Sequence, residues 1–353
     1  MPPEGMRATV TAPDPDRFFD HGTPGSHEWW YFDAIGDDGR DALVIIWYAG
    51  LPFDPSYGVA TLRHLKNPAK HPAPKALDHS AVGLSWYRDG KMAAYALNGH
   101  RSDAFRHRAD PFAVEVAASR VERDEDGYRL AVEAPAVDGR PIRAEVRFRP
   151  AAATEPFERD LGTPGAPHHW VLAAADCRVE GRVAIGDQST DFRGRGYHDH
   201  NAGAEEMSLA MRRWEWGRVH HGPLTEVYYA SEPRRGESRS LWLTCRDGRP
   251  EVVREGVPIT ANAGPRRNVF GVRHDRTIRF AEGPRFVARQ TGPAVDDGPF
   301  YQRWLASFGG VPSADPADSF DATPGFAELL DTRHLHKPWF NWMIPYRLKW
   351  PRP

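Results

Sequence analysis

Hydrophobic and polar residues alternate along much of the first 150 residues of this 353-residue chain. The run 142–148 is apolar at every second position and charged or polar between. A period of two residues gives a strand one face on a core and one in water. Asp-Gly pairs precede such runs at 38–39, 89–90, 126–127 and 138–139, and Asp-Gly favours tight hairpin turns. The pattern predicts an antiparallel meander of strands.

The second half of the chain repeats this beginning. Glu28-Trp29 opens an aromatic strand that leads to an apolar strand ending at Tyr48-Ala49, and Glu215-Trp216 leads in the same way to Tyr229-Ala230. A repeat of this size predicts an all-β protein of two antiparallel β-barrels or sandwiches in tandem. We expect an N-terminal arm (1–26), a first β domain (27–190) and a second β domain with an aromatic tail (191–353).

A few stretches depart from the strand pattern. Residues 205–213 and 326–330 are predicted to be short helical segments. The proline- and histidine-rich stretch 67–79 is predicted to be a long loop, and the proline- and glycine-rich stretch 150–167 a connector.

Composition narrows the class of protein. The formal net charge is −2 and no basic run stands out, which argues against nucleic acid as a partner. No segment reaches the apolar length of a membrane span, and residues 1–20 lack the apolar core of a signal peptide. Cys177 and Cys245 are far apart and suit a reducing cytoplasm, where we expect the protein to be located. The 12 tryptophans and 17 phenylalanines require large cores or an aromatic-lined ligand cavity.

The C-terminal segment 338–350 combines tryptophan, tyrosine and basic residues. This composition is typical of an anchor at a membrane interface, which would give peripheral contact with an inner membrane. The prolines of the segment argue against a regular amphipathic helix, and favour a tail that packs its aromatic rings over a barrel mouth. The sequence leaves both interpretations open.

The segment Gly194–Asn201 (GRGYHDHN) has the densest set of reactive side chains. On a strand, Tyr197 and Asp199 share one face, and His198 and His200 share the other. Burial in an apolar, aromatic pocket disfavours a carboxylate anion, so an acid in such a place holds a proton that it can give to an alkene. One hypothesis is therefore acid catalysis by Asp199.

Two alternatives remain open on the residues alone. His198 and His200 have a spacing found in metal sites, with His168, His169, His220 and His221 as candidates for a third ligand, although nothing fixes which. The segment could instead be a structural turn in which Asp199 and Asn201 bond backbone groups.

His168 and Trp170 form a second pair that shares a face if the chain is extended there. An indole ring stabilises a nearby cation by about 0.5–2 kcal/mol. Glu28 and Arg195 are further charged candidates, either near the site or in structural ion pairs. Other aromatic residues are candidates for the wall of a substrate cavity, or fill cores: Trp29, Trp30, Trp214, Trp216 and Tyr229.

The segments 27–32 (HEWWYF) and 194–201 resemble the carotenoid 1,2-hydratase family, also called hydroxyneurosporene synthases. That family is part of a lipocalin-like group of tandem β-barrel proteins that includes Diels–Alderase-type pericyclases. The resemblance implies that the protein adds water to the terminal C=C bond of an acyclic isoprenoid, through protonation to a tertiary carbocation. It implies an apolar substrate as partner, and neither a metal nor an organic cofactor.

The resemblance also implies roles for the candidate residues. Asp199 would donate the proton with Tyr197 hydrogen-bonded beside it, Trp170 would stabilise the cation, and His168 would orient water or take its proton. The remaining polar candidates would support them: His198, His200, Asn201, Glu28 and Arg195. The family carries Trp-Gly where this chain has Ala202-Gly203, which leaves the substrate open. Cyclisation, a pericyclase reaction, and a carrier that binds an apolar ligand unchanged are the alternatives.

Overall fold

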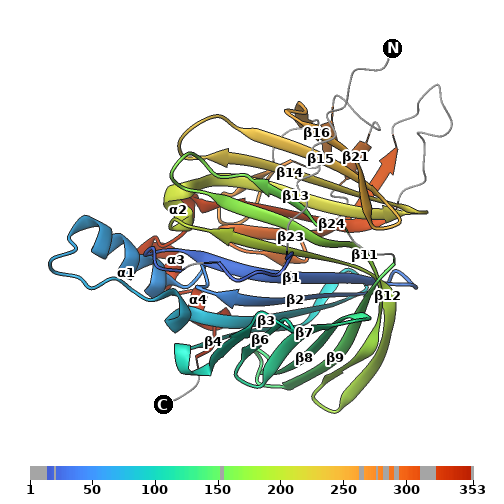
Figure 1. The fold of residues 1–353 in the computed structure, drawn as a ribbon, viewed down its shortest axis with the longest axis horizontal. Coiled ribbons are helices and arrows are strands. Elements are labelled where there is room, and N and C mark those ends of the chain that lie inside the picture. Colours follow the sequence, from blue (N-terminus) through green and yellow to red (C-terminus); the bar gives the residue numbers. More distant parts are fainter. Residues whose placement is uncertain are drawn as a thin grey trace. The chain divides into compact units, whose positions relative to one another are not determined.

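The computed structural model describes residues 14–19, 21–151, 155–261, 266–275, 277–280, 286–289, 294–310 and 323–350. The described chain divides into two compact units, 14–210 with 335–350 and 211–334 (Figure 1). The division follows Ala210, whereas the sequence placed a domain boundary after residue 190. The reason is that the strand over Gln188–Gly203 pairs on both sides with strands of the first unit.

The first unit is built on a 12-stranded antiparallel sheet with the order β4-β3-β2-β1-β12-β11-β9-β8-β7-β6-β5, and β10 pairs with β11. Its strands are β1 (His27–Gly36), β2 (Asp41–Ala49), β3 (Ser80–Arg88), β4 (Lys91–His100), β5 (Phe105–Arg108), β6 (Ala113–Val116), β7 (Ser119–Asp124), β8 (Gly127–Pro135), β9 (Pro141–Pro150), β10 (Phe157–Asp160), β11 (His168–Ile185) and β12 (Gln188–Gly203).

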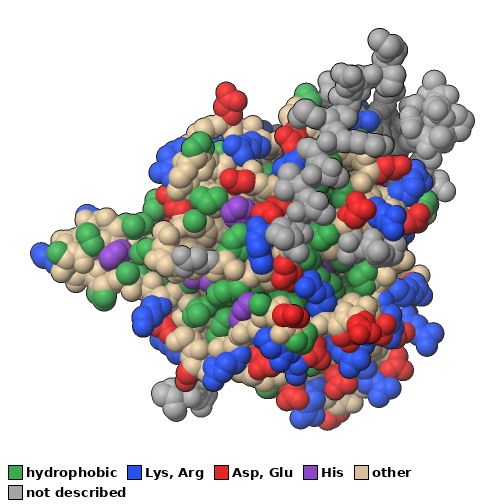
Figure 2. All heavy atoms as spheres, in the orientation of Figure 1, with side chains coloured by type: hydrophobic (Ala, Val, Ile, Leu, Met, Phe, Trp, Pro, Cys, Tyr) green, Lys and Arg blue, Asp and Glu red, His purple; other side chains and the backbone are tan. Residues whose placement is uncertain are grey.

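The hairpin turns and the alternating burial follow the sequence pattern. Asp89 and Gly90 both have positive φ, 50° and 72°, in the two-residue turn between β3 and β4. Strand β8 alternates between buried and exposed side chains from Tyr128 to Pro135. Figure 2 shows acidic and basic side chains interspersed over the surface of the β8 and β9 region. The predicted all-β class, with a solvent-exposed outer face, is confirmed.

The sheet of the first unit curls so that its edge strand β4 reaches the end of β8. The Val137 amide donates to the Tyr95 carbonyl oxygen over 2.8 Å, and the Asn98 side chain donates to the Pro135 carbonyl oxygen over 3.1 Å, so β4 lies against the end of β8. The inner face buries one large aliphatic and aromatic core that includes Trp30, Phe32, Trp47, Trp86 and Phe148. The result is a nearly closed barrel.

The helices of the first unit are short: α1 (Pro55–Lys66), η1 (Ala76–His79), η2 (Ser102–Ala104), α2 (Met207–Ala210), α3 (Pro338–Asn341) and α4 (Ile344–Arg347). Helix α1 was not predicted from the sequence, although Asp54 caps its N-terminus and Pro55 occupies its first turn, both common start signals. Of the helix predicted at 205–213, only α2 forms, because β13 begins at Met211 and pairs there with Pro233. In the part of the chain that the structure describes, no helix is long and apolar enough to cross a membrane.

The C-terminal tail returns to the first unit and extends the edge of its sheet. The Lys349 amide donates to the Leu97 carbonyl oxygen over 2.8 Å, and the Gly99 amide donates to the Lys349 carbonyl oxygen over 2.7 Å. Gly99 has no side chain, and a Cβ there would lie 2.7 Å from the Trp350 indole. The end of the tail therefore packs on edge strand β4, whereas Trp339 and Trp342 before it are 79 % and 63 % exposed.

The second unit contains a 10-stranded antiparallel sheet with the order β16-β15-β14-β13-β24-β23-β21-β20-β17, in which β22 pairs with β23, and a small sheet of β18 and β19. Its strands are β13 (Met211–His221), β14 (Leu224–Pro233), β15 (Arg239–Arg246), β16 (Arg249–Glu255), β17 (Ile259–Ala261), β18 (Arg266–Arg267), β19 (Arg273–His274), β20 (Thr277–Phe280), β21 (Phe286–Arg289), β22 (Asp296–Asp297), β23 (Tyr301–Gly310) and β24 (Thr323–Asp331), followed by the turn η4 (Thr332–His334).

The repeat seen in the sequence appears as the same strand register in both units. Glu28 pairs with Ala49 on β2, and Glu215 pairs with Ala230 on β14. The last strand of each sheet then returns to pair with the first, β12 with β1 and β24 with β13. The helical turn predicted at 326–330 is therefore wrong: these residues lie in β24, because their backbone groups pair with β13 on one side and β23 on the other, and their side chains are buried.

Candidate active site

Strand β12 holds the GRGYHDHN segment between β1 and β11. Asp199 lies opposite Tyr31 on β1 and opposite Leu172 on β11. The neighbouring strands approach closely at Gly196, where a Cβ would lie 2.7 Å from the Asp33 carbonyl oxygen and 2.6 Å from a methyl group of Val179. The segment is thus a central strand and not a turn, and its side chains alternate between two faces as predicted.

The carboxylate of Asp199 is buried and accepts three hydrogen bonds from uncharged donors. Its Oδ2 accepts from the Trp170 indole N–H and from the Tyr197 hydroxyl, each over 2.9 Å. Its Oδ1 accepts from the Asn201 side-chain amide over 3.0 Å. All four side chains are buried. Donors aimed at both oxygens stabilise the carboxylate left behind when the acid gives up a proton.

His168 begins β11 on the same face of the sheet. Its backbone amide donates to the Asp160 carboxylate over 3.0 Å, which fixes the start of the strand. Burial, reinforced by the neighbouring His27 and His169 rings, lowers the pKa of His168 to about 3, although the Asn201 side chain opposes the shift. The imidazole is therefore neutral near pH 7, and a neutral ring can orient a water molecule or accept its proton.

The two remaining histidines of the segment lie on the opposite face of β12. The Nδ1 of His198 donates to the Tyr31 carbonyl oxygen over 2.9 Å, and its Nε2 lies 2.8 Å from Asp16 Oδ1. The Nδ1 of His200 donates to the Pro15 carbonyl oxygen over 3.0 Å, and its Nε2 lies 2.6 Å from Glu28 Oε1. Because all four ring nitrogens have hydrogen-bond partners, this geometry offers no lone pair to a metal ion.

The partners of these histidines belong to the N-terminal arm and to β1. Asp16 also accepts from Arg123 over 2.6 Å and from the Tyr128 hydroxyl over 2.8 Å. Burial raises the pKa of Asp16, but the hydrogen bond and charge of His198, together with Arg123, outweigh it and leave the pKa below its ordinary value. Asp16 is therefore a buried anion that ties the arm to β12.

Glu28 and His200 form a different kind of pair. Burial raises the pKa of Glu28 well above its ordinary value and lowers the pKa of His200 to about 3. Both shifts favour the uncharged form of the group, so this pair differs from the ion pair of Asp16. Within the described residues, no group of three or more His, Cys, Asp and Glu side chains is arranged to hold a metal ion.

The structure separates the predicted aromatic wall. Trp29 is on the Asp199 face, opposite Asn201, with its ring centroid 5.8 Å from that of His168. Trp30 points to the other face, into the core, and stacks on His200 at 4.9 Å, so its predicted place in the substrate cavity is not what the structure shows. Strand alternation is the physical reason, because neighbouring residues cannot share a face.

The other three aromatic candidates belong to the second unit. Trp214 and Trp216 lie on β13, and Tyr229 on β14 is the cross-strand partner of Trp216. The rings of Trp214 and Tyr229 are 6.4 Å apart. These residues form an aromatic face within the second unit.

Arg195 and Asp33 complete the Asp199 face of the sheet, and Asp33 was not among the predicted site residues. Arg195 binds Asp176 through two hydrogen bonds of 2.7 Å, which makes it a structural ion pair of β11 and β12. Asp33 is a fully buried carboxyl group on β1, directly opposite Tyr197. The signal for Asp33 was the alternation of β1 itself, which puts residues 29, 31 and 33 on one face.

This chain is similar to known proteins over most of its length. The family model described as Carotenoid hydratase CrtC matches residues 45–352. A protein of Chlorobaculum tepidum named Hydroxyneurosporene dehydrogenase is 30 % identical over 302 residues, which cover 80 % of this chain and 77 % of that protein. Acyclic carotenoid 1,2-hydratase of Thiocapsa roseopersicina is 28 % identical over 286 residues, covering 80 % of this chain and 65 % of that protein.

The protein of the same name from Rubrivivax gelatinosus is 29 % identical over 298 residues, 81 % of this chain and 66 % of that protein. The chain thus spans about two thirds of the length of these two hydratases.

Two solved structures share the fold at low identity. An AttH protein of Nitrosomonas europaea has a TM-score of 0.58 and 13 % identity, over 92 % of this chain and 99 % of that one. Kievitone hydratase of Nectria haematococca has a TM-score of 0.52 and 9 % identity, over 88 % of this chain and 91 % of that one. These similarities confirm the predicted lipocalin-like, all-β fold and say nothing more specific.

Proposed function

Because the chain belongs to the carotenoid hydratase family CrtC, we propose that it adds water to the terminal C=C bond of an acyclic isoprenoid. The observation that carries this proposal is the buried Asp199 carboxyl group with hydrogen-bond donors on both of its oxygens. A carboxylic acid is the strongest proton donor that this arrangement offers, and an unactivated alkene needs one.

The positions of the side chains support the following steps. Asp199 gives its proton to the less substituted carbon of the double bond, and the π electrons form the new C–H bond. A tertiary carbocation remains, and the donors from Trp170, Tyr197 and Asn201 stabilise the Asp199 carboxylate that forms with it. The electron-rich indole of Trp170, already beside the acid, stabilises the cation by about 0.5–2 kcal/mol.

Water then captures the cation at the tertiary carbon through its oxygen. The resulting protonated alcohol is very acidic, so the neutral imidazole of His168 can accept its proton despite the low pKa that burial gives the ring. Return of that proton to Asp199 regenerates the acid. The sum is one water molecule added and no oxidation or reduction, and none of these steps calls on a metal or an organic cofactor.

The central test is Asp199→Asn, assayed with acyclic carotenoids and other linear terpenoids in ¹⁸O-labelled water. A general acid contributes about 10²–10⁴-fold, so turnover should fall by that factor while the fold is kept. Asp54→Asn is the matched control, since Asp54 is an equally buried carboxyl group that caps α1 and binds His79. Undiminished activity of Asp199→Asn would sink the proposal.

Mass spectrometry of the products separates the alternatives. Hydration adds one labelled oxygen and two hydrogens. Cyclisation or a pericyclic reaction leaves the mass of the substrate unchanged, dehydrogenation removes two hydrogens, and a carrier returns its ligand unaltered. The departure from the family at Ala202 makes the choice of isoprenoid the open part of the proposal.

We also propose that the protein works at the cytoplasmic surface of an inner membrane, where such a substrate dissolves. Trp339, Trp342 and Tyr346 of the tail are 79 %, 63 % and 64 % exposed, with the basic Lys337 before them and Arg347 after them in the sequence. Rings of this kind insert at the headgroup level, and basic residues favour anionic lipid. Sedimentation with anionic vesicles should fall when the three rings are replaced by serine, and equal sedimentation would contradict the idea.

A further inference from the structure

His27 is a second buried imidazole on the Asp199 face, and it has no role in the steps proposed above. It begins β1 as His168 begins β11, and both residues pair with Gly203, which lies between them on β12. The three residues therefore form one row across the sheet, with an imidazole on each side of a glycine. The centroids of the two imidazole rings are 5.9 Å apart.

The glycine in the middle of this row allows the two rings to converge. A Cβ at Gly203 would lie 2.4 Å from His27 Nε2 and 3.2 Å from His168 Nδ1. Because both nitrogens lie so near one point, a single water molecule can bridge them with hydrogen bonds of about 2.9 Å. A side chain at residue 203 would enter the space where the rings meet.

The surroundings of His27 determine which of its nitrogens accepts a hydrogen bond. Its Nδ1 lies 3.3 Å from the Gly25 carbonyl oxygen, and a carbonyl oxygen only accepts, so Nδ1 carries the proton. Burial lowers the pKa of His27 to about 4, so the ring is neutral near pH 7. Nε2 is then a buried acceptor, and it has no hydrogen-bond partner among the described residues. A buried acceptor of this kind is costly unless a water molecule or a ligand binds it.

Asn201 connects this row to the proposed proton donor. It lies on the same face of β12 as Gly203, and its side-chain amide donates to Asp199 Oδ1 over 3.0 Å. Burial lowers the pKa of His168, and the Asn201 side chain opposes this shift, as an acceptor that faces the ring does. The Asp199 carboxyl group and the two imidazoles thus belong to one continuous stretch of the face.

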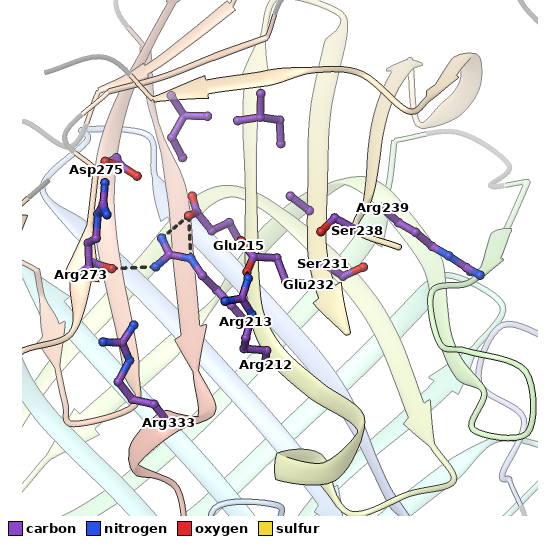
Figure 3. Close-up of a pocket in the computed structure, with 13 residues that line it drawn as sticks. Arg212, Arg213, Glu215, Ser231, Glu232, Ser238, Arg239, Arg273, Asp275 and Arg333 are labelled. Carbon is purple, nitrogen blue, oxygen red and sulfur yellow. Dashed lines mark hydrogen bonds and ion pairs between the residues drawn. The ribbon is translucent and has the colours of Figure 1, made fainter. Parts of the chain in front are cut away.

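The second unit has a different row at the corresponding place. Trp214 stands where the first unit has its first imidazole, directly before the repeated glutamate. Trp214 pairs with Leu330, and Leu330 pairs with Tyr301, so this row consists of three bulky side chains. The neighbours of Trp214, Arg213 and Glu215, bind each other (Figure 3). The pair of imidazoles around a glycine is therefore not a requirement of the repeated fold, and it occurs in the unit that carries the Asp199 face.

We propose that His27 is a second water-binding residue of the active site, and that with His168 it holds the water molecule that captures the cation. This inference rests on the proposed hydration. The water donates one hydrogen bond to His27 Nε2, and a lone pair of its oxygen forms the C–O bond at the tertiary carbon. The protonated alcohol then loses one proton to the imidazole of His168, as in the proposed steps, and no oxidant or reductant is needed.

The test measures the fate of the cation in D₂O. The probes are lycopene, squalene and geraniol, three acyclic isoprenoids with a terminal C=C bond. A cation that water captures becomes an alcohol. A cation that is not captured returns a proton to the Asp199 carboxylate and leaves an alkene, which keeps the deuterium when the proton lost is the lighter one. Mass spectrometry measures the alcohol and the deuterated alkene together.

His27→Phe keeps a flat ring to stack on Trp29 but removes the acceptor. Alcohol formation should fall about 10-fold relative to deuterium exchange, the change expected for loss of one hydrogen bond to a reacting group. His27→Gln keeps an acceptor near the position of Nε2 and should recover part of the alcohol. Gly203→Ala should shift the products in the same direction as His27→Phe, since its Cβ would meet His27 Nε2.

His64→Phe on α1 is the matched control, because His64 Nδ1 also faces a backbone carbonyl oxygen, that of His71, over 2.8 Å. It should leave both products unchanged, and thermal unfolding checks that each variant is folded. Alcohol formed at the parent rate by His27→Phe, or an equal loss of alcohol and exchange, would overturn the inference. Asp199→Asn should lose both products, which separates proton donation from water capture. A parent protein that forms neither product from any probe would refute the hydration proposal, and this inference with it.

Discussion

Replacing Tyr197 by phenylalanine removes one oxygen atom and one hydrogen bond from the Asp199 carboxylate. That bond spans 2.9 Å between buried groups. A hydrogen bond to a charged group contributes about 1.5–3 kcal/mol. If it strengthens as Asp199 becomes an anion during proton transfer, its loss raises the barrier by this amount. The expected result is a kcat about 10- to 150-fold lower, because each 1.36 kcal/mol of barrier is about tenfold in rate.

The chain provides a matched control for this change. The Tyr128 hydroxyl donates to the buried carboxylate of Asp16 over 2.8 Å, on the opposite face of β12 from Asp199. Tyr128→Phe deletes the same chemical group from the same kind of hydrogen bond. Both variants should lose stability toward urea by similar amounts, while kcat, measured from product formation, falls only in Tyr197→Phe.

Two results would refute the reasoning. If Tyr197→Phe kept the kcat of the parent protein, the hydroxyl would not assist proton transfer. If both variants lost kcat equally, the effect would come from a general loosening of the first unit and not from the carboxylate of Asp199.

Three further predictions concern stability. Burial lowers the pKa values of three histidines, to about 4 for His27 and to about 3 for His168 and His200, so the unfolded chain binds more protons than the folded one as pH falls below about 6.5. Each should cost about 1.4 kcal/mol of unfolding free energy per pH unit, and urea midpoints that stay constant from about pH 7 to about pH 5 would contradict this. Gly196→Ala should destabilise the protein by about 1–3 kcal/mol in urea unfolding, since its Cβ would meet Val179 at 2.6 Å. Gly99→Ala should release the end of the tail, seen as faster cleavage of the C-terminus by carboxypeptidase, and an unchanged cleavage rate would show that the tail is held elsewhere.

Local chemistry was sufficient to predict much of the first unit. The two-residue period of 142–148 and the Asp-Gly pairs give strands and turns directly, because both depend on a few neighbouring side chains. The same alternation predicts that Tyr197 and Asp199 share a face, and the hydrogen bond between them agrees with it. The wrong prediction of a helical turn at 326–330 also has a local cause. These residues are apolar at nearly every position, and a strand that lies between two partners can be apolar on both faces.

The partners of the candidate site could not be predicted in this way. Asp16 binds His198 across 182 positions of the sequence, and no local pattern marks that pairing. Trp30 was placed in the cavity by its identity alone, although its neighbour Trp29 faces the other way. Side-chain type indicates which residues can do chemistry, but only long-range strand pairing decides which of them face one another.

The return of the tail to the first unit bears on how the protein is made. Residues 335–350 complete the edge of a sheet whose other strands precede residue 204, and residues 211–334 of the second unit lie between them in the chain. A chain emerging from the ribosome therefore finishes the first barrel last, and β4 keeps unpaired backbone groups while residues 211–334 are synthesised. Open strand edges recruit other strands. The interval before the tail docks is thus the stage of biosynthesis at which this protein is most exposed to mispairing with a second nascent chain.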